Sequence, residues 1–117
     1  ERLEGSSLEE VMLDSYRWNK PLYNHAAEVW NHHFYFKCMT SIHHPPSRSL
    51  LERITNDFGS FDRFEVDFRK AGNSAFGCGW AWLVYNSQSG KLFVMNTIGA
   101  DNPMVQNENY WPVLTMD

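Results

Sequence analysis

Apolar residues recur at helical spacing through the first part of the chain. The segment SSLEE, residues 6–10, has the pattern of a capping box, and apolar side chains then repeat as far as Tyr16. A second helix is predicted from about Leu22 to Met39, beyond a break at Asn19–Pro21. Because this second helix is apolar almost all round, the pattern predicts that it is buried.

Two more helices are predicted beyond a proline-containing loop. Residues His43–Ser47 read as a loop, because neighbouring prolines cannot lie inside a helix. A short helix is expected from Ser49 to Asp57. Ser60 is then predicted as the N-cap of a helix that runs to about Lys70, where Gly72 is expected to end it.

The pattern changes to strands after residue 76. An apolar, aromatic strand is predicted at Trp80–Tyr85, and a turn-forming loop joins it to a return strand at Lys91–Ile98. A polar, turn-rich stretch follows at Gly99–Asn109, and Tyr110–Thr115 is predicted as a third strand. Since the helices come first and the strands afterwards, the predicted class is α+β.

Composition excludes several classes of protein. The 117 residues are 43% hydrophobic and 15% aromatic, which is typical of a packed domain and not of a disordered chain. A formal net charge of -4 argues against nucleic-acid binding, and no apolar run is long enough to cross a membrane. Cys38 and Cys78 form no CxxC pair, so we expect them to be reduced, buried thiols.

The second predicted helix carries the candidate chemistry. Glu28 and His32 are four residues apart and therefore share a helix face. One interpretation is a core histidine hydrogen-bonded to its glutamate. The other is a metal site, which imidazole and carboxylate suit but which would need further ligands from elsewhere in the fold.

Four motifs, in order along the chain, carry a resemblance to a known family. They are NHAAEVWNHHFY at 24–35, FGSF at 58–61, FGCGWAWLV at 76–84 and PVLTMD at 112–117. Together these segments resemble the iron/manganese superoxide dismutases. The resemblance implies N-terminal helices packed on a C-terminal antiparallel three-stranded sheet with helices, and a chain that is the central portion of a longer protein.

The resemblance also implies a division into domains. We expect residues 1–39 to be the remainder of an N-terminal helical domain, residues 40–48 to be a linker loop, and residues 49–117 to be a truncated C-terminal α/β domain.

The family binds one iron or manganese ion through three histidines and one aspartate. His32 and Asp117 fall on two of these ligands, and the other two are expected in segments outside the 117 residues. Trp80 falls on the aromatic residue that walls the metal pocket.

Two positions distinguish iron-type from manganese-type members in this resemblance. Ala100 stands where the manganese type has a glutamine, and Glu28 stands where the iron type has one. Iron is therefore favoured over manganese, with Glu28 as a departure. The family glutamine donates a hydrogen bond to metal-bound solvent, whereas an ionised glutamate only accepts and adds negative charge that shifts the reduction potential.

The implied activity is disproportionation of superoxide to O₂ and H₂O₂, by a homodimer or a subunit of a larger assembly. The implied location is a mitochondrion or plastid, or the cytoplasm of a bacterium. The alternative is an inactive dismutase-like subunit, without metal, of a large organellar complex such as a mitochondrial ribosome or plastid RNA polymerase. A third possibility is a genuine truncated product, which would hold two of the four ligands and bind iron weakly.

Overall fold

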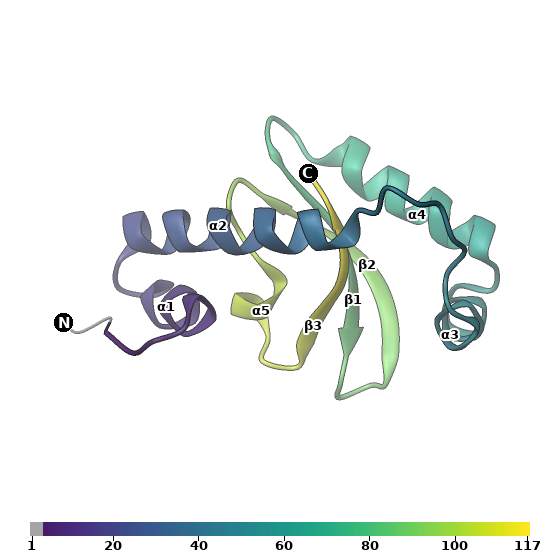
Figure 1. Ribbon diagram of the computed structural model, residues 1–117, viewed down its shortest axis with the longest axis horizontal. Helices are drawn as coiled ribbons and strands as arrows, with labels where there is room; N and C mark the ends of the chain where they lie inside the picture. The colour runs from purple at the N-terminus through teal and green to yellow at the C-terminus, as the bar shows by residue number, and fades with distance from the viewer. Residues whose placement is uncertain (1–3) are drawn as a thin grey trace.

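The helices and strands of the chain are arranged as the α+β prediction requires (Figure 1). A computed structural model describes residues 4–117. In chain order, the elements of these residues are α1 (Leu8–Ser15), α2 (Lys20–Cys38), α3 (Arg48–Phe58), α4 (Phe61–Ser74), β1 (Gly79–Asn86), β2 (Lys91–Ile98), α5 (Pro103–Gln106) and β3 (Tyr110–Met116). The three strands fall where the sequence predicts them, and the short helix α5 lies within the stretch expected to be turn-rich.

The first two helices begin at side-chain caps. The hydroxyl of Ser7 accepts a hydrogen bond from the backbone N–H of Glu10, whose carboxylate accepts one from the N–H of Ser7, so the capping box is confirmed. Asn19 caps α2 by accepting from the N–H of Leu22. Pro21 lies in the first turn of α2 and does not interrupt this helix. Backbone N–H groups in a first turn have no partner within the helix, so the N–H that proline lacks costs no hydrogen bond.

Helix α2 is buried on one side only, so the prediction of an all-round buried helix is wrong. Tyr23, Ala27 and Asn31 are fully buried, whereas Val29 is 56% and Phe36 is 64% exposed. An apolar residue can stay at the surface at modest cost, so composition alone did not reveal which side of α2 packs.

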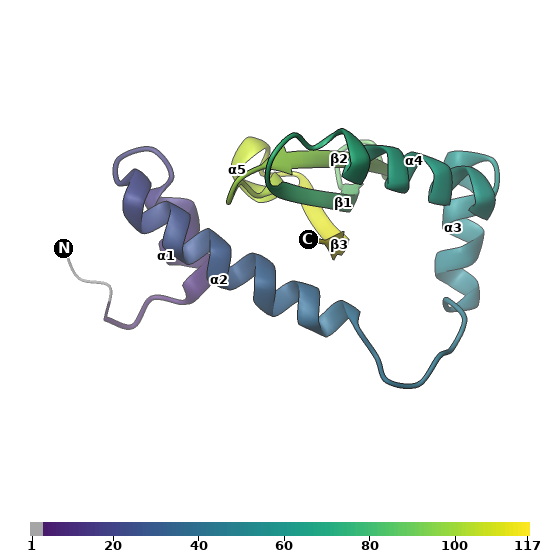
Figure 2. The ribbon, with the colours of Figure 1, turned by 90° about the horizontal axis from the view of Figure 1, so that it is seen from above.

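The loop between α2 and α3 is confirmed, and it carries the chain from one side of the sheet to the other (Figure 2). Ser60 caps α4 as expected, but Gly72 does not end the helix, which continues to Ser74. Gly72 does not have the positive φ of a glycine C-cap, and it packs in the helix against Ala81 of β1. The division into domains at the loop stays a prediction.

The sheet is antiparallel, with strand order β2-β1-β3. Because β1 is the central strand, both of its edges are hydrogen-bonded, and its residues from Trp80 to Val84 are all buried. A register shift between Leu83 and Val84 bends the β1–β3 ladder near its middle.

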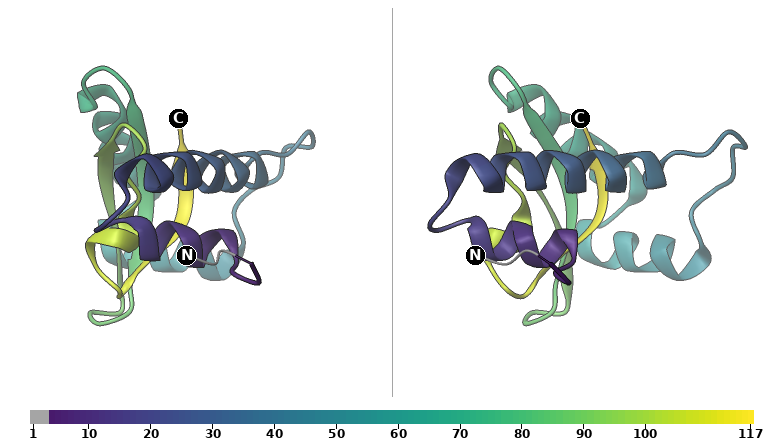
Figure 3. Two further views of the ribbon diagram at one scale, coloured as in Figure 1. Left: turned by 90° about the vertical axis from the view of Figure 1, so that its left-hand side faces the viewer. Right: turned by 60° about the vertical axis from the view of Figure 1, so that its left-hand side comes forward.

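Helices cover the sheet on both faces (Figure 3). Trp80, Trp82 and Val84 point to one face, where Trp30 and Phe34 of α2 pack against them. Alternate residues of a strand point in opposite directions, so the neighbouring Leu83 belongs to the other face. There it packs with residues of α3 and α4, namely Ile54, Leu50, Phe58, Phe61, Phe64 and Phe68.

The two cysteines depart from their prediction. Both are free thiols, but Cys38 is half-buried and Cys78 is exposed. No helix among the described residues is both long and apolar enough to cross a membrane.

Candidate metal centre

His32 is oriented by its own helix. Its Nδ1 atom lies 2.8 Å from the backbone carbonyl oxygen of Glu28, one turn earlier in α2. A carbonyl only accepts hydrogen bonds, so Nδ1 must carry the ring proton. In the neutral ring this leaves the lone pair on Nε2, which is the form in which histidine binds a metal.

Asp117, directly after β3, faces that lone pair. Its Oδ2 atom lies 3.4 Å from Nε2 of His32. Metal bonds of about 2.1 Å to nitrogen and oxygen, set about 90–110° apart, place the two ligand atoms about 3.0–3.4 Å from each other. A lone pair and a carboxylate oxygen repel unless a cation or proton lies between them, so this pair fits a divalent or trivalent metal ion. Imidazole and carboxylate are ligands that iron and manganese both accept.

Glu28 places a second carboxylate beside the same ring. Its Oε2 atom lies 3.7 Å from Nδ1 of His32, on the side where the ring donates to the helix carbonyl. His32 therefore lies between two carboxylates, and all three side chains are 40–51% exposed in the described part of the protein.

Trp80 forms a wall beside His32. The two rings meet edge to face with centroids 4.8 Å apart, and Trp80 is only 2% exposed. Tyr35 packs edge to face on Trp80 at 5.7 Å. The ring centroids of Phe36 and His32 are 6.5 Å apart. The structure thus brings together all four residues proposed from the sequence, His32, Asp117, Glu28 and Trp80, although their roles stay predictions.

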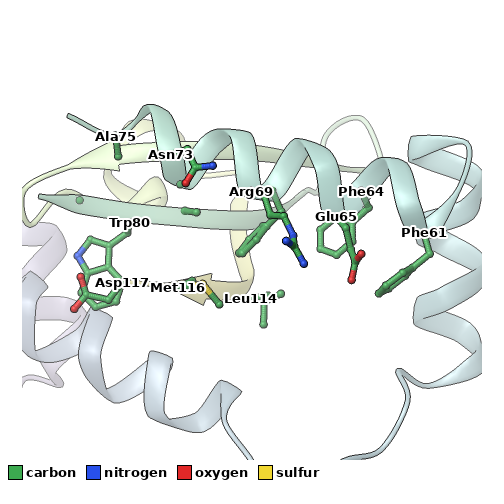
Figure 4. Close-up of a pocket in the computed structure, with 14 residues that line it drawn as sticks. Phe61, Phe64, Glu65, Arg69, Asn73, Ala75, Trp80, Leu114, Met116 and Asp117 are labelled. Atoms are coloured by element: carbon green, nitrogen blue, oxygen red, sulfur yellow. The ribbon is translucent and has the colours of Figure 1, made fainter. Parts of the chain in front are cut away.

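A groove of about 710 Å³ opens beside Asp117 and Trp80 (Figure 4). Helix α4 forms one wall, from which Phe61, Glu65 and Arg69 project into the groove. Between residues 4 and 117, no cluster of three or more histidine, cysteine, aspartate or glutamate side chains is placed to hold a metal, at His32 or anywhere else. His32 and Asp117 are therefore a partial ligand set.

A buried amide pair next to the candidate ligand is absent from the sequence-based prediction. Asn31 and Asn102 are both fully buried, and Nδ2 of Asn102 donates to Oδ1 of Asn31 over 2.9 Å. The signal was present, since Asn31 is a polar residue within an apolar helix and buried polar groups need partners. Its partner comes from a loop some 70 positions away, which no local pattern indicates.

Tyr23, on the same buried side of α2, has no hydrogen-bond partner for its hydroxyl among the described residues. Burial, together with the negative charge of Asp101, raises the pKa of Tyr23 well above its usual range. Tyr23 therefore stays protonated and neutral at physiological pH.

Comparison with known proteins places this chain in a family. The family described as iron/manganese superoxide dismutases, C-terminal domain, matches residues 46–117, which is more than half of the chain. The chain belongs to the iron/manganese superoxide dismutase family. This membership confirms the resemblance inferred from the four motifs.

Curated members of this superoxide dismutase family align with most of the chain. A superoxide dismutase [Fe] of Synechocystis sp. is 46% identical over 82% of this chain and 47% of its own length. The chloroplastic superoxide dismutase [Fe] 2 of Oryza sativa is 37% identical over 97% of this chain and 45% of its own. The superoxide dismutase [Fe] of Escherichia coli is 40% identical, covering 97% and 56%. The chain thus spans about half the length of these relatives.

Proposed function

We propose that the full-length protein carrying this chain is an iron-type superoxide dismutase, which converts superoxide to O₂ and H₂O₂. The observation that supports it best is the His32–Asp117 pair, with its ligand atoms 3.4 Å apart and the histidine proton held on the opposite ring nitrogen. Family membership and relatives named superoxide dismutase [Fe] support the same activity. Two further histidine ligands are required from outside the 117 residues.

Each residue of the site contributes a distinct physical effect. When bound, iron supplies a one-electron couple that both oxidises and reduces superoxide. His32 offers Nε2 as a ligand and is kept from rotating by the Glu28 carbonyl, while Asp117 offers a charged oxygen. Trp80 keeps water from one side of His32, because its ring is buried against the imidazole. Glu28 adds a negative charge within 3.7 Å of the ring.

The direct test measures metal content and superoxide turnover of the purified full-length protein. We expect stoichiometric iron, and we expect His32→Ala and Asp117→Ala each to lower iron affinity by at least about tenfold, a loss seen even for outer-shell changes. His25→Ala is the matched control, because His25 is an exposed histidine of the same helix. It should keep both iron and activity.

Folded, full-length protein that takes up neither iron nor manganese would contradict the proposal. The inactive structural subunit of a larger complex would then be the better interpretation, and Glu28 at the glutamine position would be part of that loss of function. Iron uptake with no turnover would contradict the enzymatic activity alone.

The proposed location and assembly follow from the relatives. A plastid or a bacterial cytoplasm is proposed because one relative is named chloroplastic and others are bacterial. Association as a homodimer is proposed from the family resemblance. Fractionation of the source cells and light scattering of the full-length protein test these two points.

A further inference from the structure

Hydrogen bonds connect α2 to the loop after β2, next to the candidate metal site. Nδ2 of Asn31 donates to the carbonyl oxygens of Ala100 (3.0 Å) and Asp101 (3.4 Å), and Oδ1 of Asn31 accepts from Asn102. Oδ1 of Asn102 accepts in turn from the N–H of Met104 at the start of α5. Each amide has one workable orientation, because the carbonyls only accept and the N–H only donates.

The path continues into both outer strands of the sheet. The Asp101 carbonyl also accepts from the hydroxyl of Thr97 on β2, which accepts from the indole N–H of Trp82 on β1. On the other side of β1, the hydroxyl of Thr115 donates to the carbonyl of Ala81. Thr115 lies two residues before Asp117. A connected set of bonds and backbone therefore runs from the helix of His32 to the strand that leads to Asp117.

Aromatic contacts also join α2 to the sheet, and at the start of α2 the ammonium of Lys20 lies 3.6 Å from the carboxylate of Asp101 in an exposed ion pair. Trp30 and Phe34 pack on Trp82 with ring centroids 6.4 Å apart, and Tyr35 packs on Trp80. Such contacts stabilise by burial but tolerate sliding, because the hydrophobic effect has no direction. Hydrogen bonds have narrow preferred lengths and angles, so the bonds of Asn31 restrict how far α2 can shift along its axis more sharply than the aromatic contacts do.

We propose that the Asn31–Asn102 amide pair is a positioning device for the metal centre. By holding α2 against the 99–103 loop, it sets the distance from Nε2 of His32 to the Asp117 carboxylate and so determines iron affinity. The ring of His32 is tied to its own helix at Nδ1, so any shift of α2 moves the ligand atom with it. This inference rests on the proposed metal site. It assigns Asn31 and Asn102 no contact with metal or substrate.

Asn102→Asp is the sharpest test of the pair. The variant keeps the acceptor that caps α5, and aspartate is as good an N-cap as asparagine. It loses the N–H₂ donor and turns a carboxylate oxygen toward Oδ1 of Asn31, whose own amide is held by two carbonyls. Asn102→Ser is a milder second variant, because serine also caps a helix but lacks the amide donor.

Asn107→Asp is the matched control. It introduces the same charge in the same connection, where Oδ1 of Asn107 accepts from the N–H of Asn109 and a carboxylate can do the same. The measurements use the full-length protein. They are the dissociation constant for iron, the electron paramagnetic resonance spectrum of the ferric ion at saturating iron, and circular dichroism of the metal-free form.

We expect Asn102→Asp to weaken iron binding by about 10–100-fold, the range typical of outer-shell positions, and to alter the ferric spectrum. Asn102→Ser should change the iron affinity and the ferric spectrum in the same direction but by less. Asn107→Asp should change neither the affinity nor the spectrum. A purely structural pair would lower the melting temperature but leave affinity and spectrum at wild-type values in the folded protein. That result, in whichever of the two Asn102 variants folds, would overturn the proposal and leave the proposed function standing. Wild-type protein that binds no iron would overturn both.

Discussion

At the scale of single residues, the orientation of His32 is a local property and its partner is not. The bond from Nδ1 to the Glu28 carbonyl lies within one helical turn, so it follows once α2 forms. Asp117 is 85 positions further along the chain and reaches Nε2 only because β3 pairs with β1 near the end of α2. Sequence reasoning proposed this pair through family motifs, since spacing alone favoured a core histidine.

Glu28→Gln is expected to raise superoxide turnover of the iron-loaded, full-length protein. A neutral amide restores a hydrogen-bond donor and removes a negative charge beside His32. We expect on the order of a tenfold increase per bound iron, which corresponds to about 1.4 kcal/mol of the activation barrier.

The control for this change is Glu52→Gln, which removes an exposed glutamate paired with Arg48 on α3. It should leave turnover unchanged. If Glu28→Gln has the same turnover per iron as the wild type, the charge of Glu28 does not limit the reaction.

At the scale of elements, two glycines that look alike in sequence have opposite roles. Gly72 lies inside α4, where a Cβ would make ordinary contact with Cβ of Ala81. Gly79 begins β1, where a Cβ would collide with the backbone carbonyl of Thr97 on β2. Local sequence predicted Gly72 as a helix stop, because a glycine after an amphipathic run commonly ends one. Packing against the sheet keeps the helix going for two more residues.

Gly72→Ala and Gly79→Ala are therefore expected to change stability in opposite directions. Gly72→Ala should raise the free energy of unfolding by about 0.5–1 kcal/mol, because alanine loses less backbone entropy in a helix. Gly79→Ala should lower it by about 1–3 kcal/mol, because β2 must move away. Chemical denaturation of the full-length variants measures both. A loss of stability in Gly72→Ala would show that the space beside Ala81 is needed.

At the scale of the whole molecule, the candidate site joins parts of the chain that are far apart in sequence. Helix α2 packs on one face of the sheet and helices α3 and α4 pack on the other, so β1 is buried from both sides. His32 comes from the helix of the first face, and Asp117 directly follows the outer strand β3. A metal ion between them would cross-link helix and sheet.

Iron is accordingly expected to stabilise the folded protein. A ligand that binds only the folded state adds about 2.7 kcal/mol at a free concentration of 100 times its dissociation constant. We expect the melting temperature of the full-length protein to rise on loading. His32→Ala should lose this rise, whereas His25→Ala should retain it. An equal rise in His32→Ala, measured by calorimetry, would place the metal elsewhere.

The sequence by itself determined the fold class, the family and every element except the short helix α5, although not where α4 ends. The caps Ser7 and Ser60, the alternation of apolar residues in the strands and four ordered motifs are local signals. Only the tertiary structure decided which side of α2 is buried, that Asn31 pairs with Asn102, and how closely Asp117 approaches His32. The two polar contacts join residues 71 and 85 positions apart, and the buried side of α2 depends on packing against several separate elements. Local patterns carry no information about such contacts.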